Sequence, residues 1–389
     1  MPAPAKAANF DSRQIGLPGH SRSHSRRRSG PGNAPWLGVI AYDGVMPVID
    51  EALEIFHGYG PEFGVGLSNH GPMGAEALCA LGRDLEVPGW SSRYRKRLRE
   101  RPPAVARIDE TNWHEALGDI TRVTDWEAFM AEQLDQMSWQ DALVRWVPRL
   151  APGLMAGATH GIIRTGHAVR SLAAGETPPR RAEFIIGIAY WAARYQLLPG
   201  ALGPAAVAMP SSIIDQLPIM PPRDRDRRPT SIFSAVAELD VFPPFAGAID
   251  MAAPGDDLPA FLSDLTQTMA ALYLPNAGPA SISYVHTVTA PSALRMLAPH
   301  LPKETALLAA RYTWQACAAI HSRGHFPHEF TMPEKPPDRD DLVDRAVHSG
   351  DEHVIKFTEA CLREYDLVPN PVFLAAPLDL SARYGRKAL

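Results

Sequence analysis

The 389-residue sequence contains only three cysteines, and they are far apart along the chain. Cys79, Cys317 and Cys361 show neither the close pairs of a structural zinc site nor a disulfide framework, so they fit a reducing cytoplasm. No apolar run is long enough to span a bilayer. The formal net charge of -5 indicates no general nucleic-acid surface. We therefore expect a cytoplasmic globular protein with neither membrane nor nucleic acid as a partner.

The familiar catalytic signatures are also absent. No Gly-x-Gly-x-x-Gly follows a clear strand, and neither a Walker loop nor a Gly-x-Ser-x-Gly elbow occurs. What the sequence does contain is 14 histidines and 38 prolines. The prolines favour helices with firm ends and long connections, and they argue against long strands in a central sheet.

The predicted fold class is all-α. Residues 1–33 are predicted to be a disordered basic tail, because residues 21–29 are rich in serine and arginine and no apolar segment follows directly. Residues 34–389 are predicted to form one large helical domain with Pro-rich connections. Apolar residues recur at helical spacing in several segments, namely 47–59, 113–149, 184–197, 262–273 and 303–320.

Prolines set the expected helix ends. Pro148, the pair Pro178-Pro179 and Pro291 are each predicted to stop a helix. Residues 281–291 have a strand-like composition, but the helical segments around them favour a helix that ends before Pro291. The Pro-rich residues 199–245 are expected to be a lid, a binding loop or a disordered segment.

Residues 349–365 are predicted to form a helix that begins with Ser349 as N-cap and Glu352 closing a capping box. His353 and Lys356 are three residues apart, so they are neighbours at the edge of its apolar face. Two readings of Lys356 stay open. Burial would lower its pKa, or its methylenes would lie along apolar surface while the ammonium reaches water.

The remaining candidates for a functional site are histidines. We expect His70 just before a helix that begins near Pro72, and His160, Arg164 and His167 on one face of another helix. Imidazole is the commonest metal ligand in proteins, and ligands from several helices can meet in a bundle core. From their spacing alone, four histidines have two possible interpretations: His70, His160, His286 and His353. They are either interior residues with satisfied hydrogen bonds or ligands of a metal ion.

Four motifs add a resemblance to these patterns. They are SNHGPM at 68–73, ATHGIIR at 158–164, YVHTVT at 284–289 and GDEHVIK at 350–356. In this order they resemble the questin oxidase-like family, over about residues 40–375. The resemblance implies an all-helical fold with a mononuclear non-haem Fe(II) held by four histidines and a carboxylated lysine. By motif, these ligands would be His70, His160, His286, His353 and Lys356.

The family includes fungal enzymes that open anthraquinone rings by Baeyer-Villiger-type oxygenation or by dioxygenase cleavage. The resemblance therefore implies an iron-dependent oxygenase that takes O2 and a quinone-like polycyclic aromatic of the polyketide type, inserts oxygen and cleaves a ring. Arg164 or His167 would orient the substrate or act as acid or base. Trp191 and Tyr284 would stack on it.

Two other functions stay open. One is an NADPH-dependent Baeyer-Villiger monooxygenase, although the dinucleotide fingerprint is missing. The other is a metal-free helical protein that binds an aromatic metabolite and consumes no oxygen. Measuring oxygen consumption with and without NADPH, and with and without iron, separates the three.

Overall fold

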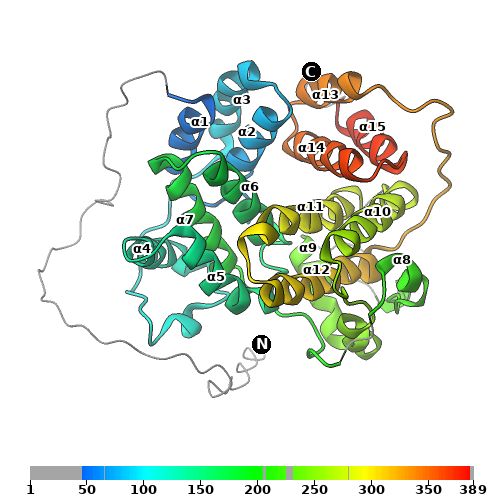
Figure 1. Cartoon of the computed structure of the whole chain (residues 1–389), viewed down its shortest axis with the longest axis horizontal. Coiled ribbons are helices and arrows are strands. Elements are labelled where there is room, and N and C mark those ends of the chain that lie inside the picture. Colours follow the sequence, from blue (N-terminus) through cyan, green and yellow to red (C-terminus); the bar gives the residue numbers. More distant parts are fainter. Residues whose placement is uncertain (1–45, 65, 205–206, 225–230, 279, 386–389) are drawn as a thin grey trace, which may run out of the picture. The chain divides into compact units, whose positions relative to one another are not determined.

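The computed structural model describes residues 46–64, 66–204, 207–224, 231–278 and 280–385. The tail predicted at residues 1–33 lies outside the described residues. Across the described ranges the fold is all-α, as predicted (Figure 1). The one sheet found there is a short antiparallel pair of β1 (Glu62–Phe63) and β2 (Leu67–Ser68). Contacts group the described residues into one compact unit, and its assignment as one functional domain stays a prediction.

The helices follow one another along the chain with short turns and Pro-rich connections between them. Their bounds are α1 (Val48–His57), α2 (Gly71–Ala80), α3 (Val87–Tyr94), α4 (Val123–Leu134), α5 (Trp139–Leu150), α6 (His160–Ala174), α7 (Pro178–Ala193), α8 (Pro210–Ile213), α9 (Ile232–Ala237), α10 (Leu258–Asn276), α11 (Ser281–Leu297), α12 (Lys303–Gly324), α13 (Arg339–Ser349), α14 (Glu352–Leu367) and α15 (Val372–Tyr384).

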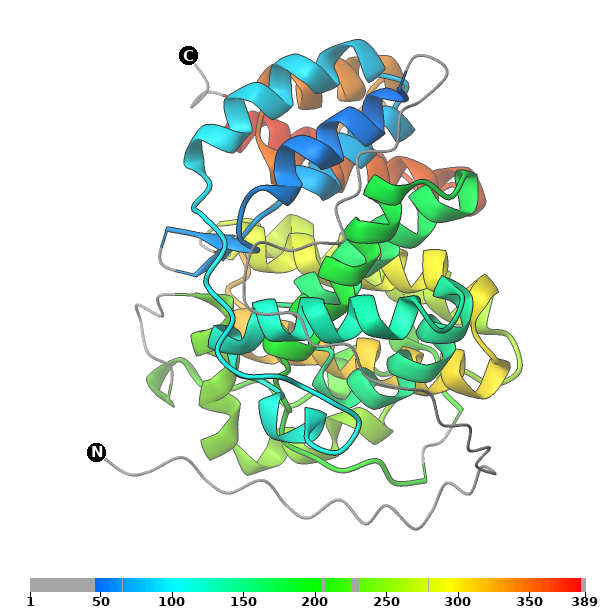
Figure 2. The same cartoon turned by 90° about the vertical axis from the view of Figure 1, so that its left-hand side faces the viewer.

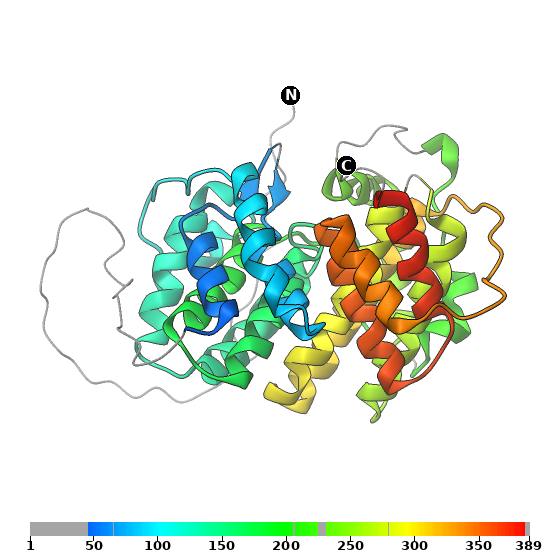
Figure 3. The same ribbon diagram turned by 90° about the horizontal axis from the view of Figure 1, so that it is seen from above.

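Four helices form a closed ring at the centre of the packing. α2 contacts α6 and α14, and α11 contacts the same two helices. Other helices surround this ring. α1 and α3 pack with α2 (Figure 2), α13 and α15 pack with α14 (Figure 3), and α7 covers α6. Each helix of the ring carries one of the four histidines named above, so the fold brings together segments that are far apart in sequence.

Several prolines act differently from the prediction. Pro178 and Pro179 begin α7 instead of ending the preceding helix, because a proline in the first turn loses no helical hydrogen bond. Pro291 lies inside α11, and Pro148 lies inside α5. The missing N–H of Pro291 frees the carbonyl of Thr287, and the thiol of Cys317 donates to that oxygen at 3.3 Å. Tertiary contact thus lets α11 run on to Leu297.

The start of α14 also differs from the prediction. Ser349 is the last residue of α13, and Gly350 follows it with φ 63°, a left-handed conformation that glycine adopts without strain. Asp351 is the N-cap of α14, and its carboxylate accepts from the backbone N–H groups of residues 353 and 354 at 2.9 and 3.2 Å. Glu352 closes no capping box, since its carboxylate binds Arg97 instead. The predicted apolar face of α14 is buried.

The Pro-rich stretch 199–245 is ordered over its described residues. It contains α8, α9 and several 3-10 turns, and it is fixed to α12 because the N–H of Met220 donates to the carbonyl of Ser322 at 3.1 Å. A role as lid or binding loop stays a prediction. Among the helices that the structure describes, none alone has the length and apolar composition to cross a membrane. One bent pair, residues 232–241 with 243–250, passes that test jointly.

Candidate metal centre

The structure brings the four histidines together. His70 is the N-cap of α2, His160 is the first residue of α6, His286 lies in α11 and His353 is the second residue of α14. The ring of His160 lies 4.5 Å from that of His70 and 4.5 Å from that of His286, measured between centroids. The ring of His353 lies 4.6 Å from His70 and 6.0 Å from His286. Four side chains from four helices therefore surround one point.

Hydrogen bonds fix which ring nitrogen faces that point. Nδ1 of His160 donates to the carbonyl of Gly157 at 2.6 Å, so Nε2 carries the free lone pair. Nδ1 of His70 lies 3.5 Å from a carboxylate oxygen of Glu352, which favours a proton on the same nitrogen. The two Nε2 atoms face each other at 2.5 Å. A contact this short needs either a proton shared between the two nitrogens or a cation beside their lone pairs, and the second arrangement suits a metal ion.

A strained turn sets the position of His160. Gly157, Ala158 and Thr159 have φ values of 55°, 60° and 68°, three left-handed residues in succession. This conformation costs roughly 1–2 kcal/mol for each residue with a side chain. A Cβ on Gly157 would lie 2.8 Å from the hydroxyl of Tyr190, so this position also needs glycine for space. Strain of this kind is typical of functional sites, and here it folds the Gly157 carbonyl back against His160.

Burial keeps three of the imidazoles neutral. Burial lowers the pKa of His70, His160 and His286 well below the usual value for histidine. Repulsion between protonated neighbours would lower each pKa further, with the largest such effect from Lys356 for His70, from His286 for His160 and from His353 for His286. A neutral imidazole is the form that donates a lone pair to a metal.

Lys356 lies on α14 three residues after His353, so both are on the same side of that helix. Only 2% of this residue is exposed. Burial lowers its pKa to about 8, although Glu352 and Asp351 act in the opposite direction. Over the described ranges, no carboxylate lies within ion-pair distance of its nitrogen. Of the two readings of Lys356, burial is the correct one.

A set of surrounding polar groups holds the histidines in place. The backbone N–H of His70 donates to the hydroxyl of Tyr94 at 2.8 Å. Glu352, next to His70, is itself held by Arg97 at 2.7 Å, and Arg97 lies over the Tyr94 ring. Carboxylates that orient a ligating histidine through its second nitrogen are common around protein metal sites.

The residues present fit a first-row transition metal such as iron. Ligand atoms of His70, His160 and His353 all lie within 4.8 Å of one another. Nδ1 of His286 is buried without a hydrogen-bond partner in the part of the chain that the structure describes, so this side chain has donor capacity left. Several imidazoles form a ligand set that suits iron, copper or zinc.

Comparison with known proteins finds a family match over part of the chain. Residues 68–172 match the questin oxidase-like family. The match includes the motifs of His70 and His160, whereas those of His286 and His353 lie outside it. The family name denotes an oxidase, and hence an oxidoreductase. A search of curated proteins finds no match.

Arg164 lies within the questin oxidase-like segment but outside the histidine cluster. Its guanidinium binds both oxygens of Glu183 in α7, at 2.6 and 2.9 Å, and both side chains are buried. The charge of Arg164 is therefore already paired with a buried carboxylate. Its Nη1 is buried and has no hydrogen-bond partner among the described residues. A role in orienting substrate stays a prediction.

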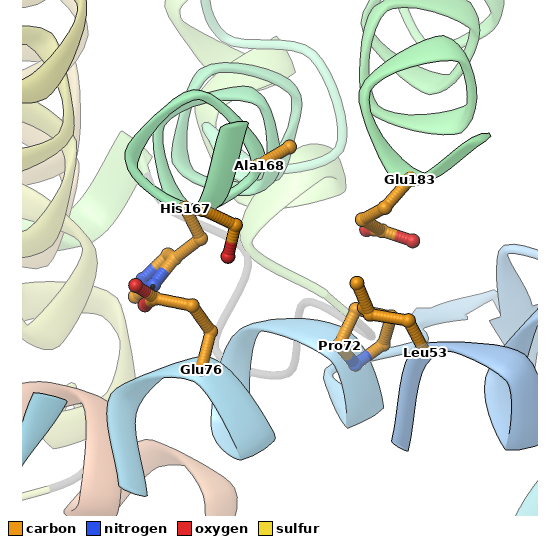
Figure 4. A pocket seen from close by; sticks show the side chains of 7 residues that line it. Leu53, Pro72, Glu76, His167, Ala168 and Glu183 are labelled. Carbon is orange, nitrogen blue, oxygen red and sulfur yellow. Dashed lines mark hydrogen bonds and ion pairs between the residues drawn. The ribbon is translucent and has the colours of Figure 1, made fainter. Parts of the chain in front are cut away.

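His167 points toward Glu76 across the α2–α6 interface (Figure 4). Its Nδ1 donates to the Glu76 carboxylate at 2.6 Å. Burial lowers its pKa although Glu76 opposes the change. A cavity of about 10 Å³ adjoins both residues, which is room for about one water. Its role as acid or base is untested and stays a prediction.

The two aromatic residues predicted to stack on substrate are buried. The indole of Trp191 packs against Gly161, where a Cβ would lie 2.7 Å from the ring. The hydroxyl of Tyr284 lies 2.6 Å from Nδ1 of His321. Their contact with a substrate stays a prediction. Sequence reasoning did not single out Glu352 as the carboxylate beside His70, because its position in the chain indicated a helix cap.

Proposed function

We propose that this protein is an iron-dependent oxygenase that acts on a quinone-like polycyclic aromatic, inserting oxygen and cleaving a ring. The observation that carries the proposal is the convergence of four histidines from four helices beside a buried lysine. The questin oxidase-like match supports the oxidoreductase class and an anthraquinone-like substrate. The ligands would be His70, His160, His286, His353 and Lys356.

Iron bound here would supply a Lewis acid and a redox centre for reaction with O2. The histidines would act as neutral donors, held in that form by burial. Lys356 would supply the negative charge. Its lowered pKa makes the neutral amine accessible near pH 8, and this amine can attack carbon dioxide to form a carbamate and release one proton. The carbamate oxygen is chemically similar to a carboxylate ligand.

The remaining candidates would serve the substrate. Arg164 has an unused buried N–H, which supports contact with a quinone or phenolate oxygen. His167 would move a proton, with Glu76 fixing its ring. Trp191 and Tyr284 would provide aromatic surface for stacking.

Metal content tests the proposal directly. The full chain is loaded with Fe(II) without oxygen, desalted, and assayed for iron by mass spectrometry. We expect about one iron per chain in the wild type, and a large loss in His160→Ala and His353→Ala. His114→Ala is the matched control, because this histidine is exposed and far along the chain from the four motifs. Iron binding that is absent, or equal in all variants, would contradict the proposal.

Oxygen consumption with an anthraquinone then tests the reaction. We expect uptake that requires iron and does not require NADPH. Uptake that depends on NADPH but not on iron would favour the NADPH-dependent Baeyer-Villiger alternative. Binding of the quinone with no uptake under any iron loading would favour a metal-free binding protein.

A further inference from the structure

A second buried cluster lies along the same helices as the histidines, and it consists of charged side chains. Arg170 of α6 binds both carboxylate oxygens of Glu76 in α2, with Nε to Oε1 at 2.5 Å. Its Nη1 binds Oε1 of Glu359 in α14 at 2.5 Å. One guanidinium therefore ties together three of the four helices in the ring.

The fourth helix is joined through Arg363. Its Nε donates to the same Glu359 oxygen at 2.9 Å, and its Nη1 donates to the carbonyl of Ser292 in α11 at 3.1 Å. His167 completes the cluster by donating to Glu76. We call Glu76, Arg170, Glu359 and Arg363 the charged layer. All four helices of the ring are thus linked by ionic contacts or hydrogen bonds to one connected set of side chains.

The charged layer joins the same helices that carry the residues of the candidate metal centre. Glu76 is on the helix that His70 begins, Arg170 is on the helix that starts with His160, and Glu359 follows Lys356 by three residues on α14. Hydrogen bonds and ion pairs join these charged groups to one another, to His167, to the Ser292 carbonyl and to Glu364, and within the described residues none reaches the four imidazoles. Any effect on a metal would therefore act through helix position.

The charges of the layer are balanced and persistent. Burial alone would raise the pKa of Glu76 and Glu359, but the guanidiniums of Arg170 and Arg363 outweigh it and hold both pKa values below the usual range. Two carboxylates face two guanidiniums, while burial favours the neutral form of His167. A planar guanidinium with several fixed N–H groups imposes its geometry on both carboxylates, which a flexible ammonium cannot do.

We propose that Arg170 is a positioning residue for the metal centre, which sets the spacing of α2, α6 and α14 and so the spacing of His70, His160 and Lys356. This inference rests on the proposed function, because it assumes that these residues bind a metal. The prediction is that removing the guanidinium weakens metal binding out of proportion to its effect on stability. Residues around metal ligands typically change metal affinity by roughly 10–100-fold when mutated.

The test uses the full chain and three variants, Arg170→Met, Arg170→Lys and Arg122→Met. Arg122 is a matched control, because it forms a similar partly buried pair with Asp125 at 2.6 Å in α4, outside the ring. Side-chain exposure is 23% for Arg170 and 19% for Arg122. Co(II) is titrated into metal-free protein, the dissociation constant and visible spectrum are recorded, and urea unfolding gives the stability without metal.

We expect Arg170→Met to bind Co(II) about 10–100-fold more weakly and to change the cobalt spectrum. Arg170→Lys should bind more tightly than Arg170→Met, since it keeps the charge. Arg122→Met should lose stability but keep the wild-type affinity and spectrum. If Arg170→Met does not fold, Glu359→Gln replaces it in the comparison. This variant keeps the shape of the Glu359 side chain and removes the negative charge that Arg170 binds.

The inference is overturned if the folded Arg170 or Glu359 variant binds Co(II) with the wild-type affinity and spectrum. It is also overturned if Arg122→Met weakens binding equally, since the effect would then be general destabilisation. Failure of the proposed function gives a different result, because the wild type itself would then bind no metal.

Discussion

Gly161 provides the sharpest test of how the fold positions His160. It is the second residue of α6, directly after His160, and it lies against Trp191 of α7. A Cβ added at Gly161 would lie 2.7 Å from the indole Cγ and 2.8 Å from the backbone Cα of Trp191. The indole could turn away, but the backbone atom can only move with its helix. Gly161→Ala must therefore push α6 and α7 apart.

The size of the effect follows from these distances. Ordinary contact of a Cβ begins at 3.4 Å, so the Trp191 backbone must retreat by about 0.6 Å at this point. Overpacking of this kind typically costs about 1–3 kcal/mol. Alanine recovers roughly 1 kcal/mol through its higher helix propensity. We expect a net loss of about 0–2 kcal/mol in unfolding free energy. We also expect weaker metal binding, because His160 moves with the first turn of α6.

Urea unfolding followed by circular dichroism measures the stability, and Co(II) titration measures the binding. Gly58→Ala is the matched control. Gly58 is the C-cap of α1 with φ -70°, and an added Cβ there would meet nothing within 4 Å. Gly58→Ala should be neutral or stabilising by about 0.4–1 kcal/mol. If Gly161→Ala were as stable as Gly58→Ala and bound Co(II) like the wild type, the argument from close helix packing would be wrong.

Two further predictions concern buried polar groups. Tyr190→Phe removes a hydroxyl that donates to Glu62 at 2.9 Å and lies 2.6 Å from Ser68, two residues before His70. We expect the unfolding free energy, measured with urea, to fall by roughly 1–3 kcal/mol and Co(II) binding to weaken. An unchanged Co(II) dissociation constant would contradict the link to the candidate metal centre. Burial, with His325 nearby, lowers the pKa of His321 to about 4. The unfolded chain therefore takes up a proton near pH 6.5 before the folded protein does, and stability falls by up to about 3 kcal/mol between pH 6.5 and 4. Unfolding curves of His321→Gln should show a smaller fall in stability over this pH range. An equal fall would mean that other groups cause the pH dependence.

Helical periodicity predicted most of the fold, because the buried faces are regular. The segments at 47–59, 262–273 and 303–320 correspond to α1, α10 and α12. Helix ends were predicted less well. A proline stops a helix only when nothing else satisfies the carbonyl it frees, and Cys317 satisfies that of Thr287 beside Pro291. No residue near Pro291 in the sequence indicates that a thiol from another helix donates to this carbonyl.

The four histidines of the centre came from the motifs and not from their spacing, since ligands on four separate helices leave no local pattern. Ion pairs were the least predictable part. The sequence shows that Arg164 and Arg170 are charged, but the tertiary fold selects Glu183 for one and Glu76 for the other. The left-handed turn before His160 was equally hidden, because Ala158 and Thr159 are not residues that favour positive φ.

The ring of α2, α6, α11 and α14 has a consequence for protein synthesis. During translation α14 emerges last of the four, more than 280 residues after His70. Until then the nascent chain holds at most three of the imidazoles, without Lys356 and without the Glu352 carboxylate beside His70. Contacts between segments this distant form late, after the loops between them close. On the proposal that these residues hold a metal, a metal ion that reached the nascent chain would meet an incomplete ligand set, and stable binding would follow the docking of α14.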